Sequence, residues 1–175
     1  MRTHWLHNRR GALILIISLA WPVTGDTDTR PHPYDRALLG LQAFALQTAG
    51  FRPEYRRLGI DEARLSERTQ ARLRDAGLTL VEESEALSDP RGALLRLNLK
   101  LVFTTYFDTH YYELTLQVVQ NQPLPQNSRA VVPRIIWAQH INGHTSELRL
   151  KRVNQIARDL IDRFITAHRQ QNSLP

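Results

Sequence analysis

The chain has 175 residues, of which 42% are hydrophobic and 23% are charged, and its formal net charge is +6. This length and composition fit one globular domain and exclude collagen-like, low-complexity and disordered chains. Cysteine is absent. Its absence excludes disulfides, thiolate metal sites, a cysteine nucleophile and the lipid-accepting cysteine of a bacterial lipoprotein.

The first 25 residues have the pattern of a secretory signal peptide. Arg2, Arg9 and Arg10 occur there without any acidic residue, and they precede the apolar run 11–21. That run is well short of the roughly 20 residues that a helix needs to cross a bilayer. We therefore predict a cleaved signal over residues 1–25 and an exported protein, periplasmic or secreted, with no stable membrane span after cleavage.

The cleavage site is predicted before Asp26, because Val23-Thr24-Gly25 offers small or compact residues after Pro22. Cleavage after Ala20 is the alternative, and retention of the segment as an anchor or a buried helix is another. The Arg9-Arg10 pair also fits a twin-arginine signal. However, the small residues that follow the pair argue against that type of signal.

Half of the net positive charge belongs to the targeting segment. Residues 1–25 carry three arginines and no acid, so the net charge of the mature chain falls from +6 to +3. A mildly basic exported protein is not expected to bind nucleic acid. The pairs Arg56-Arg57 and Lys151-Arg152 are interpreted as solvated surface rather than as a patch for anionic lipid or polysaccharide.

The first elements of the domain follow an extended leader over residues 26–37, which contains Pro31 and Pro33. Residues 38–46 are predicted to form a first strand, although they would also suit a short helix. Residues 61–76 predict a helix with Asp61 as its N-cap and Gly77 as its stop. Residues 78–81 then predict a short strand.

A hairpin follows in the middle of the chain. Leucines alternate with polar residues over 95–103, which predicts a strand whose face from Leu95 to Phe103 is buried. After Asp108-Thr109-His110, residues 112–118 alternate in the same way, with Tyr112 on the apolar face. These two segments predict an antiparallel hairpin.

The last part of the chain predicts a loop, a strand and a helix. Residues 121–128 read as a loop, and 131–138 read as a strand in which Pro133 favours an edge position or a bulge. Asn142-Gly143 predicts a turn. Thr145 or Ser146 would then cap a helix that ends near His168.

Together these elements predict an α+β fold. We expect a two-layer sandwich, with a mostly antiparallel sheet of four to five strands and two helices packed on one face. The domain spans 38–170 and is followed by a tail over 171–175. Residues predicted to lie between sheet and helices are Leu97, Leu99, Leu114, Leu116, Leu160 and Phe164.

Several segments carry a family resemblance. They are Leu58-Gly59-Ile60, the stretch 71–78, the alternating leucines from Leu95, the stretch 112–118, Ile136-Trp137 and 160–164. On these segments the chain resembles a small uncharacterised family of exported bacterial α+β proteins. Because the shared positions are mostly core and helix-end residues, the resemblance implies fold and export and implies no activity.

The sequence holds no strong catalytic or metal-binding motif. His140 and His144 have the spacing of two zinc ligands on one helix face, but Asn142-Gly143 would break that helix. No serine lies in a nucleophile elbow and no glycine motif for phosphate occurs. The acidic run 82–85 is interpreted as a solvated cluster rather than as paired catalytic carboxylates. We therefore predict no catalytic, metal or cofactor site.

The candidate binding surface is aromatic. Tyr106 and Tyr111 flank the predicted hairpin tip, on the face opposite the leucines and near Lys100 and His110. Exposed tyrosines in this setting suit a protein or glycan partner, and the alternative is that they only fix the register of the hairpin. Trp137 is expected in the core.

These patterns favour a noncatalytic exported interaction or accessory domain, whose partner is an envelope protein. The alternative is an exported hydrolase with a site assembled from distant residues, for example His110, Glu113 and His140.

Overall fold

The computed structural model describes residues 36–103, 109–146, 150 and 152–172, which all belong to one compact unit spanning 31–175. The predicted signal peptide and the leader up to residue 35 lie outside the described residues. Arg36 to Gly40 form a turn, so the last two residues of the predicted leader already belong to the domain.

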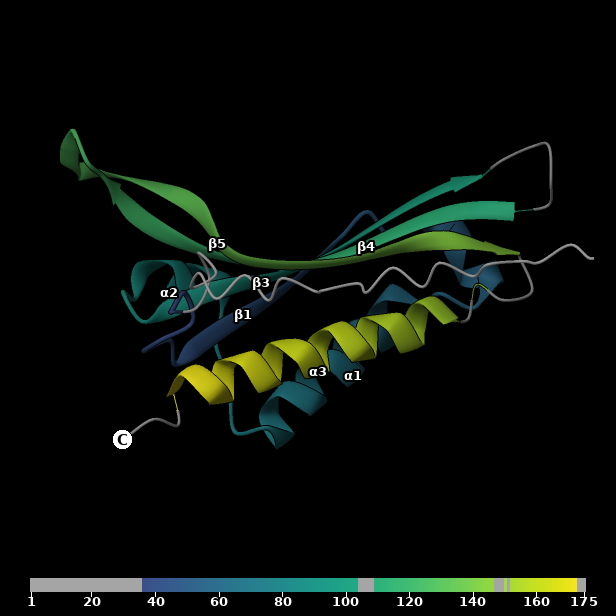
Figure 1. The fold of residues 1–175 in the computed structure, drawn as a ribbon, viewed down its shortest axis with the longest axis horizontal. Helices are drawn as coiled ribbons and strands as arrows, with labels where there is room; N and C mark the ends of the chain where they lie inside the picture. Colours follow the sequence, from purple (N-terminus) through teal and green to yellow (C-terminus); the bar gives the residue numbers. More distant parts are fainter. Residues whose placement is uncertain (1–35, 104–108, 147–149, 151, 173–175) are drawn as a thin grey trace, which may run out of the picture. The chain divides into compact units, whose positions relative to one another are not determined.

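The sheet has five strands in the order β2-β1-β3-β4-β5 (Figure 1). The strands are β1 (Ala43–Ala49), β2 (Thr79–Leu80), β3 (Gly92–Phe103), β4 (Thr109–Leu124) and β5 (Asn127–Ser146). β1 runs parallel to β2 and β3, whereas β4 runs antiparallel to both β3 and β5. The prediction of an α+β fold with a mostly antiparallel sheet is confirmed.

Two long helices cover one face of this sheet (Figure 1). They are α1 (Glu62–Asp75) and α3 (Arg152–Asn172), and a short 3-10 helix, η1 (Pro53–Leu58), precedes α1. Asp61 caps α1 as predicted, since its carboxylate accepts a hydrogen bond from the Arg64 backbone N–H at 3.2 Å. None of the helices in the described part of the chain is long and apolar enough to span a membrane.

The core lies between these helices and the sheet. Strand alternation directs Leu97 and Leu99 of β3 and Leu114 and Leu116 of β4 toward the helices, where each is at most 2% exposed. Phe164 of α3 is fully buried. Its ring contacts Phe44 and Trp137, with ring centroids 5.4 and 5.7 Å away, so Trp137 is a core residue as expected.

A third helix, α2 (Glu83–Ser88), packs on the other face of the sheet. The predicted acidic cluster forms the start of this helix, where carboxylates are favourable near the positive end of the helix dipole. Ala86 of α2 is buried with Ala45, Leu94 and Val119, which alternate with the residues that face α1 and α3. Because α2 has only six residues, it covers one part of this face.

The first strand begins later than predicted. Residues 38–42 precede β1, and Leu38 and Leu41 nevertheless enter the core. The reason lies at the end of α3: Gln171 accepts a hydrogen bond from the Leu38 N–H at 2.7 Å, and Asn172 accepts one from the Gly40 N–H at 2.8 Å. These contacts also show that α3 continues two residues into the predicted tail.

The predicted loop at 121–128 is wrong, because β4 extends to Leu124 and β5 begins at Asn127. Pro123 and Pro133 both lie in this extended ladder, with Pro123 opposite Val131 and Pro133 opposite Asn121. The prediction of an edge position for Pro133 is confirmed, since β5 is the last strand of the sheet.

The predicted turn at Asn142-Gly143 is also wrong, because β5 runs through it to Ser146. Gly143 lies opposite Tyr112, and a Cβ at Gly143 would meet the Tyr112 hydroxyl oxygen at 2.9 Å. The glycine therefore accommodates a cross-strand tyrosine ring. Thr145 and Ser146 pair with β4 instead of capping a helix, and α3 begins only at Arg152.

Phe103 departs from the predicted buried face. Its side chain is 48% exposed, although it alternates correctly with Leu99 and Leu101. Among the residues that the structure describes, the Tyr55 and His110 rings lie against it, with centroids 6.1 and 4.8 Å away. Phe103 is the last residue of β3. At this end of the strand its side chain packs against these two rings, whereas the leucines earlier in β3 are buried beneath the helices.

Candidate functional site

The candidate site lies on the face of the sheet opposite α1 and α3, beyond the part that α2 covers. We call this surface the open face. It consists of Asn98, Lys100 and Val102 on β3, Tyr111, Glu113 and Thr115 on β4, and His140, Asn142 and His144 on β5.

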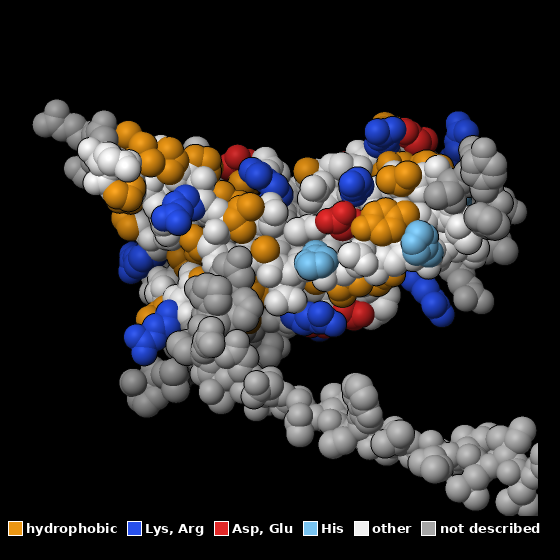
Figure 2. Space-filling model, turned by 45° about the horizontal axis from the view of Figure 1, so that its top comes forward, with side chains coloured by type: hydrophobic (Ala, Val, Ile, Leu, Met, Phe, Trp, Pro, Cys, Tyr) orange, Lys and Arg blue, Asp and Glu red, His pale blue; other side chains and the backbone are white. Residues whose placement is uncertain are grey.

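Strand register brings these residues together. Alternation separates them from the leucines, and cross-strand pairing sets Val102 opposite Tyr111 and Lys100 opposite Glu113. Tyr111 in turn lies opposite His144. Figure 2 looks onto this side of the sheet and shows apolar, basic, acidic and histidine side chains interspersed on it.

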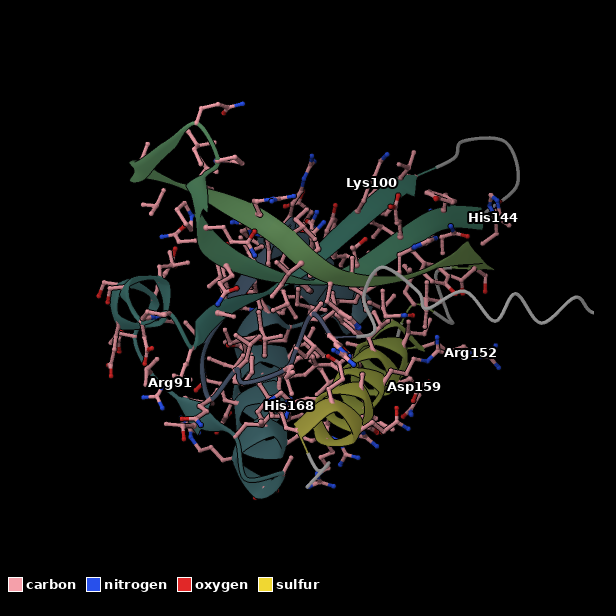
Figure 3. All side chains as sticks on the ribbon, turned by 60° about the vertical axis from the view of Figure 1, so that its left-hand side comes forward. Arg91, Lys100, His144, Arg152, Asp159 and His168 are labelled. Atoms are coloured by element: carbon pink, nitrogen blue, oxygen red, sulfur yellow. The ribbon has the colours of Figure 1, made fainter. Side chains whose placement is uncertain are left out.

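An aromatic pair lies at one end of the open face, next to the strand ends. The Tyr111 and His144 rings meet edge to face, with centroids 5.5 Å apart. Tyr111 is half-buried and His144 is exposed, while the neighbouring Val102 is 43% exposed. Figure 3 shows Lys100 and His144 at the same end of the sheet, away from the helices. The surface therefore combines an aromatic and apolar row at one end with a polar and charged row beside it.

The structure brings together only part of the predicted site. Tyr111 and Lys100 share the open face, as the alternation predicted. Tyr106 lies outside the described residues. His110 points to the helix side, where its ring packs on Phe103 and its buried Nδ1 atom has no hydrogen-bond partner within the described part of the chain.

The residues named for a hydrolase are also separated. Glu113 and His140 are on the open face, but His110 is an odd number of residues from Glu113 on the same strand and so points to the opposite face. His140 is exposed. General acid and base groups work within hydrogen-bond reach of one substrate atom, which this arrangement does not provide.

Metal binding has no support from the arrangement of ligands. His140 and His144 share one face of β5, with Asn142 between them. Throughout the ranges that the structure describes, no three His, Cys, Asp or Glu side chains are grouped so that they could hold a metal ion.

A second concave surface was not singled out from the sequence. It is a groove of about 550 Å³ between α1 and α3, and five arginines line it: Arg56, Arg64, Arg68, Arg72 and Arg158. Three of them follow one another at intervals of four along α1. That spacing was a usable signal, because residues four apart share one face of a helix.

Comparison with known proteins does not identify the chain. No protein-family model matches it, and no curated protein matches it either.

Proposed function

We propose that the protein is a noncatalytic, exported interaction domain that binds an envelope protein through the open face. The observation that carries the proposal is the Tyr111–His144 ring pair, which stands on a sheet face that no described helix covers beyond α2. Tyrosine is enriched at protein interfaces because its rigid ring buries much surface and its hydroxyl can still form hydrogen bonds.

Charge on the open face indicates the chemistry of the partner. Lys100 is exposed, and Arg96 lies on the same face four residues earlier in β3. Glu113 is the one acidic residue among those that define the open face, where two histidines are also present. A partner that places carboxylates around an apolar contact would complement this pattern.

The separation of His110 from Glu113 and His140 favours binding over hydrolysis. An exported hydrolase would require these groups to converge on one substrate atom. The sheet instead directs them to two faces. The signal-like pattern of residues 1–25 supports export, and the mature charge of the chain gives no reason to propose a nucleic-acid partner.

The test is capture of the partner from an envelope fraction by variants of the open face. The double variant Lys100→Ala, Tyr111→Ala should lose the captured protein, because it removes the aromatic ring of the open face and its neighbouring cation. The matched control is Arg163→Ala, Thr166→Ala on α3, where both side chains are exposed away from the sheet. This control should retain capture.

The charge assignment is tested with single changes. Lys100→Glu should weaken capture and Glu113→Gln should strengthen it, and both effects should diminish as salt is added. Equal recovery by the double variant and by its control, with both folded by circular dichroism, would overturn the open face as the docking surface.

A further inference from the structure

The groove between α1 and α3, which we call the arginine groove, contains more arginines than the packing of two helices requires. Arg64, Arg68 and Arg72 line one face of α1, and Arg158 faces them from α3. Like charges four residues apart on a helix repel each other. A groove that served only to join two helices would not need such a row of cations.

Two of the five arginines are neutralised within the protein. Arg56 lies 3.4 Å from the Asp61 carboxylate, and Arg72 forms a hydrogen-bonded ion pair with Asp162. The hydrogen bond and the charge of Asp162 raise the pKa of Arg72 above its ordinary value. These two pairs neutralise arginines at the two ends of the groove and leave its centre unneutralised.

The central three arginines lack such partners. Arg64, Arg68 and Arg158 are exposed, and in the described portion of the chain none of their side chains forms an ion pair or hydrogen bond. The one acidic residue that lines the groove is Asp61, which Arg56 and the α1 N-terminus already engage. The groove therefore has an uncompensated positive charge.

The floor of the groove is apolar apart from one hydroxyl. Leu65, Ile161 and Thr69 line it and are buried, with Thr69 only 5% exposed. The Thr69 side chain has no hydrogen bond to another described residue. Asn154 lies at the edge and donates to the Gly59 carbonyl at 2.9 Å, which ties η1 to α3 beside the groove.

We propose that this groove binds a ligand that carries two phosphate groups and an apolar part. Guanidinium groups donate paired hydrogen bonds to phosphate oxygens, and several can surround one tetrahedral phosphate. Arg64 and Arg68 are separated by about 6 Å along α1, because a helix rises roughly 1.5 Å per residue. Their long side chains allow both guanidinium groups to converge on two linked phosphates, and Leu65 and Ile161 offer a surface to the apolar part.

The direct test is calorimetry with inorganic pyrophosphate, using protein purified after expression of the full chain. Binding should occur and should weaken steadily with added salt. Arg68→Gln and Arg158→Gln should each lower the affinity about tenfold or more, since each removes a charged hydrogen-bond donor. Arg163→Gln is the matched control, because Arg163 is an exposed arginine of α3 that does not line the groove, and it should bind like the unchanged protein.

Stability separates a binding role from a structural one. Arg68→Gln relieves the repulsion along α1, so its thermal midpoint should equal or exceed that of the unchanged protein while its affinity falls. Arg158→Gln tests the same site from the other helix. A lowered midpoint in both variants with unchanged affinity would overturn the proposal.

A second arm distinguishes the source of the phosphates. Flotation with phosphatidylcholine vesicles that contain cardiolipin, a lipid with two phosphates, tests a lipid headgroup against phosphatidylcholine alone, and pyrophosphate tests a soluble ligand. Binding in either arm that depends on Arg68 and Arg158 supports the proposal. Failure in both arms overturns it, as does equal affinity for the dicarboxylate glutarate. Tyr111→Ala should leave this binding unchanged, so the groove and the open face can fail independently.

Discussion

At the scale of single residues, Phe164 connects the helix layer to the sheet. Its ring is fully buried and lies edge to face against Phe44 and Trp137. The Phe164→Ala variant should lose about 3 to 5 kcal/mol of unfolding free energy, because it leaves a cavity among these rings. Urea denaturation measures the loss. A value below about 0.5 kcal/mol would mean that the three rings do not form the core.

Gly50 is a second position where a small change of side chain should lower stability, because a Cβ atom has no room there. Its φ angle is +77°, and a Cβ there would meet the Leu99 backbone oxygen at 2.0 Å. Gly50→Ala should therefore cost about 2 to 5 kcal/mol, from backbone strain together with the steric overlap. The control is Gly77→Ala, which has a φ of +86° but open space around the added Cβ.

Gly77→Ala should cost only about 1 to 2 kcal/mol in the same denaturation experiment, since strain acts there alone. Similar losses for the two glycine variants would show that β3 moves easily to accommodate a side chain at Gly50.

At the scale of elements, the N-cap of α1 is a testable contribution. The Asp61 carboxylate accepts the Arg64 N–H and lies near the Arg56 guanidinium. Asp61→Ala should destabilise the protein by about 1 kcal/mol, as other N-cap replacements do. Asp75→Ala removes the same charge from the other end of α1, where a carboxylate opposes the helix dipole, and it should be neutral or slightly stabilising. Equal thermal midpoints for the two variants would contradict the cap.

The elements show where sequence patterns were sufficient. Strict alternation predicted β3 and the first half of β4, and the Asp61 and Gly77 signals predicted α1, because these features depend on neighbouring residues alone. The course of β5 through Gly143 depends instead on Tyr112, which is 31 positions away in the chain. Likewise, the turn before β1 depends on side chains at the end of α3.

In the candidate site too, the features that depend on neighbouring residues were predicted, and those that depend on distant parts of the chain were not. Alternation placed Tyr111 and Lys100 on the face opposite the leucines, and the register confirms it. The pairing of Tyr111 with His144 required the course of β5, which the sequence pattern did not predict. The arginine groove required the approach of α3 to α1, although the four-residue spacing of its arginines was present in the sequence.

At the scale of the whole molecule, export is the first prediction to test. Residues 1–25 combine an arginine-bearing start with an apolar run too short to span a bilayer. Amino-terminal sequencing of protein recovered from the envelope fraction should begin at Asp26, or at Trp21 if cleavage follows Ala20. Detection of Met1 in that fraction would contradict removal of the signal.

The central claim is that the open face binds a protein, and cross-linking in growing cells tests it most directly. A photoreactive benzoylphenylalanine in place of Tyr111 lies in the aromatic row of that face, and the same residue in place of Arg163 marks the exposed side of α3. Irradiation should join position 111, and not position 163, to one envelope protein, and Lys100→Glu should reduce the adduct. The absence of an adduct at position 111, or the same adduct at both positions, would contradict the claim.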